Sequence, residues 1–366
     1  MAKRRAKGEG TIYFWDEKKL WVGQIYLPNG KRKVKYSKTQ KVIQEWLLTQ
    51  RNAIKQGAWV SDDSLTISQF IDRYYTDVAS HNLRPKTLEV YETLIRLHIK
   101  PEIGDIRLSQ LRPDHLQKLY SDKLNAGLSR RTVQFIHSIL HKALDQALKW
   151  GLVNRNVSDL VDAPSPKRKA PETLNVEQVG KLLDTVQNHR WYPVYVLAIY
   201  CGFRIGEVLG IHFEDIDLES GIIHVRHAVQ TLKGKGIVVT EPKTENSRRP
   251  ITVPSFALGI LRSHMESQKS NQGLIFTTST GKPVSPRNLV RHFKSALKEA
   301  GLPNIRFHDL RHTSATLLLS AGVHPKIVQE RLGHSQISLT LDTYSHVIPG
   351  LQEEAAEKMD AILGRV

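Results

Sequence analysis

The stretch FHDLRHTSATLLLSAGVHPKIVQERLGHSQISLTLDTYSH, residues 307–346, decides the fold and holds most of the reactive side chains of the chain. Its polar, reactive residues fall within 37 positions and are His308, Arg311, His312, His334 and Tyr344. Apolar residues recur between them at spacings of three and four, which predicts amphipathic helices. His308 and Arg311 are three apart, so one helical face presents both. Gly333, directly before His334, permits a tight helix end.

The composition points to a polyanionic partner. The chain has 366 residues, enough for two or three domains, with a formal net charge of +17 and a pI of about 9.8. Nucleic acid is the first candidate and an acidic membrane surface the second. The single cysteine, Cys201, excludes an internal disulfide, as expected for a reducing cytosol. The longest apolar stretch, residues 194–203, is too short to span a bilayer, so we expect a soluble intracellular protein.

The first 60 residues form a small basic domain. They hold 14 Lys and Arg against 4 Asp and Glu. Three β-like runs are followed by a helical pattern over residues 39–56, and Pro28-Asn29-Gly30 is a strong hairpin signal between the second and third runs. The runs cover residues 11–15, 20–27 and 31–37, and the third carries Lys31, Arg32, Lys33 and Lys35. Such a sheet backed by one helix can enter a DNA major groove; the alternative is a solvated charged face.

Residues 65–161 have the pattern of a bundle of four or five helices, near residues 66–80, 85–98, 113–126 and 129–150. Proline near the first turn, or a Ser cap, starts three of them, at Pro85, Pro113 and Ser129. Basic residues at helix starts suit phosphate contact, and here they are Arg84, Lys86, Arg130 and Arg131. The next segment, residues 162–171, reads as an exposed linker that tracks DNA through Lys167, Arg168 and Lys169; a nuclear signal is the alternative by composition.

Residues 172–366 are expected to form a mainly α catalytic domain with a small antiparallel sheet. Helices are predicted from Asn175, over residues 192–200, and from Ser255 and Ser285. Short strands are predicted at residues 222–229, 237–240, 250–253 and 274–277. The fold class is therefore multidomain α+β: a three-stranded sheet plus helix, then a helical bundle, then this mainly α domain.

Two basic residues upstream of the opening stretch call for an explanation. Arg204 follows an apolar helix between glycines, and burying part of an arginine is costly unless it is paired. Either Glu207 or a bound anion can pair it, and a plain structural ion pair with Glu207 is the bland alternative. Lys243 lies near the tip of a predicted hairpin, where a lysine can reach a site and give up a proton. Taken alone it is a weak signal, because surface lysines in turns are common.

Together these side chains suit phosphate chemistry. Two guanidiniums can hold a phosphodiester and stabilise the charge of a pentacovalent transition state. Tyr344 is a potential nucleophile, although a hydroxyl with a pKa of about 10 needs a base or a cationic field. The rival reading is a zinc hydrolase, since His308 and His312 lie at i and i+4. No third ligand stands at a characteristic spacing, and Arg311 between them repels a cation.

Four blocks of the sequence resemble, in order and spacing, the signature of the tyrosine recombinases, the phage-integrase family. The blocks are Arg204-Ile205-Gly206-Glu207, His308-x-x-Arg311-His312, Leu332-Gly333-His334 and Asp342-Thr343-Tyr344. Each block alone is weak, and the combination is highly specific. The resemblance covers the whole chain. It implies an arm-site DNA-binding domain in residues 1–60, a core-site-binding helical domain in residues 65–161 and a catalytic domain in residues 172–366.

The resemblance also implies a mechanism without metal, cofactor or external energy. Tyr344 attacks the scissile phosphate of double-stranded DNA, forms a 3′-phosphotyrosyl link and releases a 5′-hydroxyl. The 5′-hydroxyl of a partner strand then attacks this link and reverses the step. Arg204 and Arg311 clamp the phosphate, Lys243 protonates the leaving oxygen, His308 takes the tyrosine proton and His334 hydrogen-bonds the phosphate. Glu207 and His312 are expected to support the site. The catalytic set is thus Arg204, Lys243, His308, Arg311, His334 and Tyr344.

The tail supports assembly. Residues 351–366 predict an amphipathic helix whose apolar face is formed by Leu351, Ala355, Met359, Ile362 and Leu363. The resemblance implies that this helix is donated to a neighbour, linking a homotetramer on two DNA duplexes; packing on its own domain is the alternative. A host DNA-bending protein or an excision factor is a further expected partner. Related readings are a type IB topoisomerase, a chromosome-dimer resolvase and a non-catalytic DNA-binding regulator of the same fold.

Overall fold

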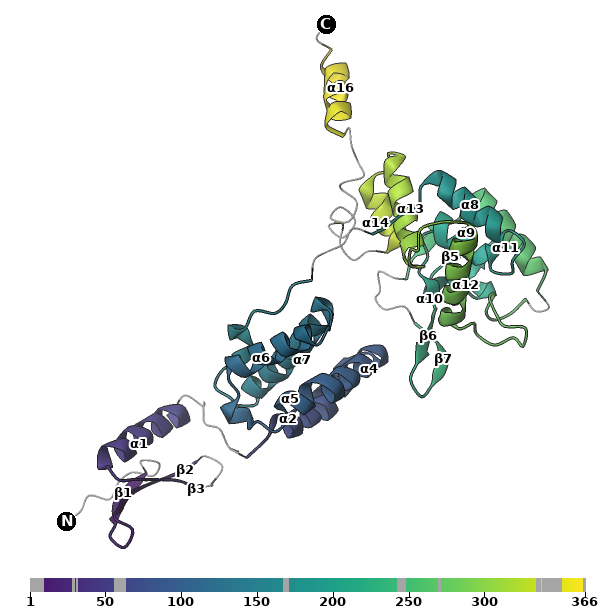
Figure 1. Cartoon of the computed structure of the whole chain (residues 1–366). Helices are drawn as coiled ribbons and strands as arrows, with labels where there is room; N and C mark the ends of the chain where they lie inside the picture. Colours follow the sequence, from purple (N-terminus) through teal and green to yellow (C-terminus); the bar gives the residue numbers. More distant parts are fainter. Residues whose placement is uncertain are drawn as a thin grey trace. The chain divides into compact units, whose positions relative to one another are not determined.

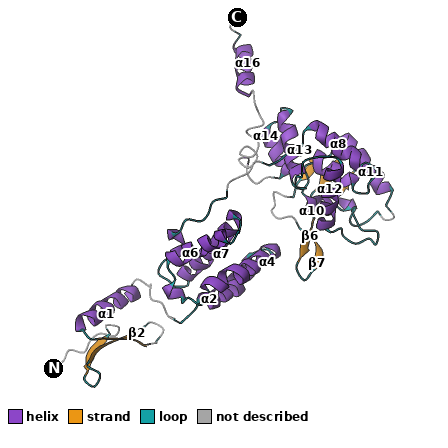
Figure 2. Cartoon of the chain, in the orientation of Figure 1, coloured by secondary structure: helices purple, strands orange, loops and turns teal. Residues whose placement is uncertain are grey.

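The structure is a computed structural model, which describes residues 10–27, 30, 32–55, 64–166, 171–241, 248–268, 271–333, 337 and 351–364. The chain divides into two compact units, residues 1–168 and 169–366. Helices dominate both units, and the strands are confined to small antiparallel sheets (Figures 1 and 2). The multidomain α+β class predicted from the sequence is confirmed.

The first unit begins with a three-stranded antiparallel sheet and one helix. Strands β1 (Thr11–Trp15), β2 (Leu20–Tyr26) and β3 (Arg32–Ser37) pair in that order, and α1 (Gln40–Lys55) follows. Ile25, Ile43 and Leu47 form the core between sheet and helix. The close packing depends on Gly23, because a Cβ there would lie 2.5 Å from Ile43 Cγ2. The hairpin between β2 and β3 and the helix predicted after it are confirmed.

The rest of the first unit is a helical bundle. Its elements are α2 (Ile67–Tyr74), η1 (Tyr75–Ala79), α3 (Ser80–Asn82), α4 (Pro85–Leu94), η2 (Ile95–Ile99), α5 (Lys100–Ile103), η3 (Leu108–Gln110), α6 (Pro113–Asn125), α7 (Arg130–Lys149) and η4 (Val157–Leu160). The predicted starts are confirmed: Pro85 and Pro113 occupy first helical positions, and the Ser129 side chain accepts from the Thr132 amide. Helix α7 supplies much of the core, with Ile136, Ile139 and Leu140 buried.

The second unit surrounds one apolar helix. Its helices are α8 (Val176–Val186), α9 (Tyr192–Tyr200), α10 (Ile205–Leu209), η5 (Phe213–Asp215), α11 (Ser255–Glu266), α12 (Pro286–Glu299), α13 (Asp309–Ser320), α14 (Pro325–Leu332) and α16 (Leu351–Leu363). Strands β4 (Ile216–Asp217), β5 (Ile222–His224) and β8 (Pro250–Thr252) form one sheet, and β6 (Ala228–Leu232) pairs with β7 (Gly236–Thr240). Residues 193–199 of α9 are buried, which confirms the predicted core helix.

Two strand predictions in this unit are wrong. The run at residues 222–229 is divided between β5 and β6, which belong to different sheets. The break lies where β6 turns to pack on α10: a Cβ on Gly210 would stand 2.9 Å from Ala228 Cα. Residues 274–277 form isolated bridges, His212 with Leu274 and Thr277 with Pro283, in place of a strand. Pro283 has no amide hydrogen with which to extend a ladder.

None of the helices within the described ranges has both the length and the apolar character needed to cross a membrane.

The approach of β6 to α10 predicts a contrast between two glycines. Gly210→Ala forces a methyl group against the backbone of residues 227 and 228, so we expect a loss of about 1–3 kcal/mol in unfolding free energy. Gly180→Ala on the exposed face of α8 meets nothing within 4 Å and should gain about 0.5–1 kcal/mol. Calorimetry of both variants measures the difference; equal effects would contradict the packing described.

Candidate active site

A buried carboxylate, Glu207, organises the site. Its side chain is 4% exposed and lies in the first turn of α10. One oxygen accepts the Arg204 amide at 3.1 Å, and the other pairs with the Arg204 guanidinium. Arg249 approaches the same carboxylate from β8's side, with Nη2 3.0 Å from Oε2 and Nη1 3.4 Å from Oε1. Two arginines are thus held by one glutamate.

The Glu207 carboxyl is ionised. Burial alone raises its pKa, but the positive charges of Arg249 and Arg204, the hydrogen bond from Arg249 and the charge of Arg311 outweigh burial and hold the pKa below its usual range. The carboxylate therefore stays charged at neutral pH. Three guanidiniums around one carboxylate leave an excess of positive charge, which is suited to an anionic ligand.

Arg311 forms the floor of the site. It lies in α13 and is 2% exposed. Its Nη1 donates to the Gly202 carbonyl at 2.9 Å, and its Nη2 donates to the Leu332 carbonyl at the end of α14. Gly202 has a φ of +68°, and a Cβ there would lie 2.6 Å from Leu332 Cδ2. Arg311 thus ties the segment before Arg204 to the end of α14.

The end of α14 is held by a second arginine. Arg249 Nε donates to the Arg331 carbonyl at 2.8 Å, and Arg331 in turn donates to the carbonyls of Thr252 and Tyr200. Gly333 closes the helix with a φ of 64°, which confirms the tight end predicted there. The residue that follows is His334. Arg311 therefore binds the carbonyl of the residue directly before Gly333, and Arg249 binds the carbonyl two residues before it.

Arg249 was missed by the sequence reasoning, although a signal was present. Residues 249, 251 and 253 are buried and alternate with exposed positions, as a half-buried strand requires. An arginine on the buried face of a strand needs a carboxylate partner. That alternation pointed to a partner for Arg249, and the partner is Glu207.

His308 and His312 lie at the start of α13. His308 is the residue before the helix, and its ring stands edge-on to that of His312, with 5.1 Å between centroids. Desolvation, together with the charges of His312, Arg311 and Arg204, lowers the pKa of His308 to about 4 against the opposing charge of Asp309. Burial likewise lowers the pKa of His312. His308 is therefore neutral at pH 7 and can accept a proton.

Asp309 fixes this helix start. It is buried, and Arg306 holds both of its oxygens, with Nη2 2.7 Å from Oδ1. Among the residues that the structure describes, no third histidine, cysteine or carboxylate joins His308 and His312 in a metal-type cluster.

The structure brings together Arg204, Glu207, His308, Arg311 and His312. Three of the predicted catalytic residues, Lys243, His334 and Tyr344, lie outside the described residues.

The predicted DNA-binding residues are at the surface where they are described. Arg32 and Lys35 are exposed on β3, and Lys33 is half-buried beside them. At the helix starts the exposed residues are Arg84, Lys86, Arg130 and Arg131. Lys86 pairs with Glu89, and the Arg131 guanidinium lies 4.8 Å from the Phe135 ring centroid. The remaining predicted residues, Lys31, Lys167, Arg168 and Lys169, fall outside the described ranges.

Comparison with known sequences identifies two regions. Residues 172–349 match the Phage integrase family, and residues 66–124 match the Phage integrase, N-terminal SAM-like domain. A protein named Tyrosine recombinase XerC-like, from Caldanaerobacter subterraneus subsp. tengcongensis, is 30% identical over 362 residues; the match covers 91% of this chain and 93% of that protein.

Solved structures share the fold. The Tn1549 transposon integrase, in complex with a circular intermediate DNA, matches with a TM-score of 0.72 and 21% identity, covering 81% of this chain and all of that one. A lambda integrase tetramer bound to a Holliday junction matches with a TM-score of 0.60 and 19% identity, covering 93% of this chain and 96% of that one. At sequence identities of 21% and 19%, these two matches show a shared fold and nothing further.

The pairing of Arg249 with Glu207 predicts that two neighbouring arginines, Arg248 and Arg249, contribute very differently to the free energy of unfolding. Arg249→Leu removes one partner of a buried ion pair, so we expect a loss of about 3 kcal/mol or more in unfolding free energy. Arg248→Leu removes an exposed pair with Glu241 and should cost less than about 1 kcal/mol. Calorimetric unfolding of the full chain tests this, and similar losses in the two variants would show that Glu207 does not depend on Arg249.

The pKa of His308 predicts an acid-side loss of stability. Its folded pKa of about 4 lies below the usual value of 6.5, so the unfolded chain binds the proton first as the pH falls. Stability should therefore fall between about pH 6.5 and pH 4. NMR titration, with His308→Gln to assign the resonance, should give a midpoint well below 6.5. A midpoint at 6.5 or above would contradict the environment described.

Proposed function

The chain belongs to the phage integrase family of tyrosine recombinases, and on that premise we propose how its residues act on DNA. The protein is a site-specific recombinase, an enzyme that cuts and rejoins DNA strands. The roles of its individual side chains are proposed here. The catalytic set is Arg204, Lys243, His308, Arg311, His334 and Tyr344, with Glu207 and His312 in support.

One observation carries the proposal: Arg204 and Arg249 pair with the buried Glu207 carboxylate, and the positive charge of Arg311 acts on the same group. Arg204 is 35% exposed at its side chain and offers its free edge to a scissile phosphate, while Arg311 adds charge from the floor of the site. Because the guanidiniums are held before DNA arrives, they need little reorganisation to stabilise the pentacovalent transition state. Glu207 acts as the residue that orients Arg204, because its own oxygens are engaged by Arg204 and Arg249.

The proposed chemistry is a phosphoryl transfer between two hydroxyls. The Tyr344 Oη attacks phosphorus and forms the 3′-phosphotyrosyl bond while the bond to the 5′-oxygen breaks. His308, neutral at pH 7, takes the tyrosine proton, and the negative phosphate brought by DNA raises the pKa of His308 toward that task. Lys243 gives a proton to the leaving 5′-oxygen, and His334 donates to a non-bridging oxygen. The reverse reaction, with a partner strand's 5′-hydroxyl, completes rejoining without cofactor.

The amino-terminal sheet is proposed to bind a second class of DNA site, the arm site. The register places Tyr13, Val22 and Tyr36 side by side, and alternation sets Tyr26 and Arg32 on the same face, away from α1. Exposed tyrosines with a basic residue suit a groove and its phosphates. This domain favours a mobile-element integrase over a chromosome-dimer resolvase. Residues 65–161 are assigned to the core site and residues 172–366 to catalysis.

Assembly as a tetramer on two duplexes is proposed from the tail. Helix α16 exposes three large apolar side chains, Met359, Ile362 and Leu363, the second of them by 75%. Side chains of this kind are buried by a partner in a stable assembly. The lambda integrase relative forms a tetramer on a Holliday junction, which supports the same arrangement here. A host DNA-bending protein or an excision factor completes the proposed partners, acting with the enzyme on DNA in the bacterial cytosol.

The nucleophile assignment predicts loss of a covalent adduct in one tyrosine variant. A nicked suicide duplex carrying the attachment site should trap wild-type protein on DNA, because the 5′-hydroxyl fragment diffuses away. Tyr344→Phe should form no adduct, since no oxygen remains to attack. Tyr200→Phe, which removes a hydroxyl at the surface of α9, is the matched control and should form the adduct normally. An adduct of Tyr344→Phe on gels would show that another residue is the nucleophile.

A further inference from the structure

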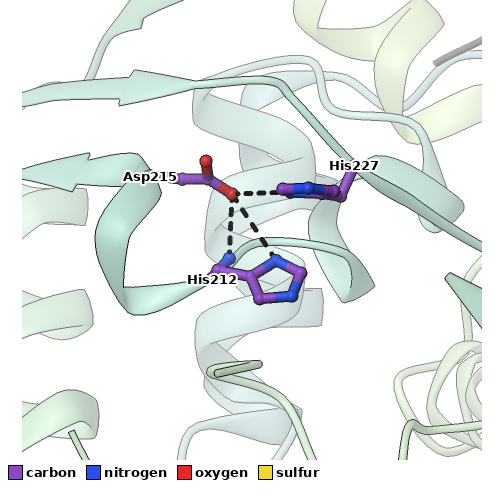
Figure 3. A group of neighbouring side chains, drawn as sticks. All are labelled: His212, Asp215 and His227. Atoms are coloured by element: carbon purple, nitrogen blue, oxygen red, sulfur yellow. Dashed lines mark hydrogen bonds and ion pairs between the residues drawn. The ribbon is translucent and has the colours of Figure 1, made fainter. Parts of the chain in front are cut away.

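A second cluster of reactive side chains lies apart from the residues assigned to phosphate chemistry. His212, Asp215 and His227 converge, with one ligand-type atom from each within 4.8 Å of the others (Figure 3). His212 directly precedes η5, Asp215 is the last residue of η5, and His227 directly precedes β6. Residues 15 positions apart in the sequence are thus brought to one point. We propose that this cluster binds a divalent transition metal of the zinc class.

The separations fit such an ion. The His227 Nδ1 is 3.3 Å from Asp215 Oδ2, and the His212 Nδ1 is 3.7 Å from the same oxygen. Ligands at about 2.0–2.1 Å from tetrahedral Zn²⁺ stand roughly 3.3–3.4 Å from one another. Both histidine-to-carboxylate separations are therefore within a few tenths of an ångström of the tetrahedral value, and the three ligand-type atoms all lie within 4.8 Å of one another. Two imidazoles and one carboxylate are ligands that zinc accepts, with solvent in the fourth position.

The surroundings of Asp215 suit a metal ligand. The side chain is 1% exposed, and its Oδ1 accepts no hydrogen bond from the described residues. Arg226 lies 3.5 Å from Oδ1 as an ion-pair partner and is half-exposed, so it can neutralise the outer oxygen while Oδ2 faces the two histidines. The His212 amide donates to Oδ2 at 3.1 Å and fixes the carboxylate. Outer contacts of this kind orient the ligands of metal sites.

One contact competes with the metal. The His212 Nδ1 is 3.0 Å from the Gly210 carbonyl and donates to it when protonated. Metal binding displaces that proton, and the affinity should therefore rise with pH. The ion can reach the cluster from outside: His227 lines an open hollow of about 420 Å³, and His212 lines another of about 850 Å³.

The position of the cluster gives the metal a structural role. His212 follows the end of α10 by three residues, and His227 lies at the base of the β6–β7 hairpin. Gly210 already holds these two elements in backbone contact through Ala228. An ion here clips the hairpin base to the helix that carries Glu207. The bound metal thus stabilises the contact between the hairpin and α10 and takes no part in the phosphate chemistry.

The test is metal binding by the untagged full chain. Titration with Co²⁺ should give visible absorption bands that saturate at one ion per chain, and Zn²⁺ should abolish them by competition. Zn²⁺ should also raise the Tm. His227→Ala and His212→Ala should each weaken Co²⁺ binding by more than the roughly 10–100-fold that loss of an outer contact costs. His224→Ala on β5 is the matched control and should bind as wild type does.

Folding is checked by the Tm of each variant without metal, which should stay near that of wild type for the two half-buried histidines. The proposal is overturned if Co²⁺ produces no saturable band in wild type. It is equally overturned if both histidine variants fold and bind Co²⁺ as tightly as wild type, or if His224→Ala weakens binding as much as they do. None of these readouts depends on DNA cleavage.

Discussion

The ion pair network centred on Glu207 is the constraint on which the rest of the site depends. A carboxylate buried to this degree is tolerated only when it is paired and hydrogen-bonded. Arg204 and Arg249 both pair with it, and Arg311 adds a third positive charge nearby. The same pairing that stabilises Glu207 holds the exposed edge of Arg204 in place. Stability and the proposed phosphate recognition therefore depend on the same interaction.

The network also reaches the end of α14. Arg249 and Arg311 each donate to a carbonyl of its last residues, and Gly333, with a positive φ, ends the helix directly before His334 in the sequence. Arg311, a proposed phosphate ligand, and Arg249, which pairs with Glu207, thus hold the helix end that precedes the segment of the proposed nucleophile. A shift of that helix end should therefore move the arginine side chains, and phosphate binding by the arginines should in turn shift the helix end. This coupling gives a physical basis for timing the attack.

Much of this architecture was predictable from the sequence. The starts at Pro85, Pro113 and Ser129 follow from capping rules that depend on local residues, and the core helix at 192–200 follows from its apolar composition. The split between β5 and β6 was not predictable, because it depends on the backbone contact of Gly210 with Ala228 across the fold. Arg249 could have been assigned to a buried face from alternation, yet its partner lies 42 residues upstream. Pairings of that kind require the tertiary structure.

The central claim, that Arg204 neutralises the charge of the scissile phosphate, is tested most directly by removing that charge from the DNA. Wild type and Arg204→Ala are compared on suicide duplexes carrying either an ordinary scissile phosphate or a neutral methylphosphonate, and adduct formation is timed. Arg204→Ala should lose about 10²–10³-fold in rate on the phosphate, as for other losses of a transition-state donor. The methylphosphonate should restore most of that rate. An equal loss on both substrates would contradict the account, since the arginine would then act other than through charge.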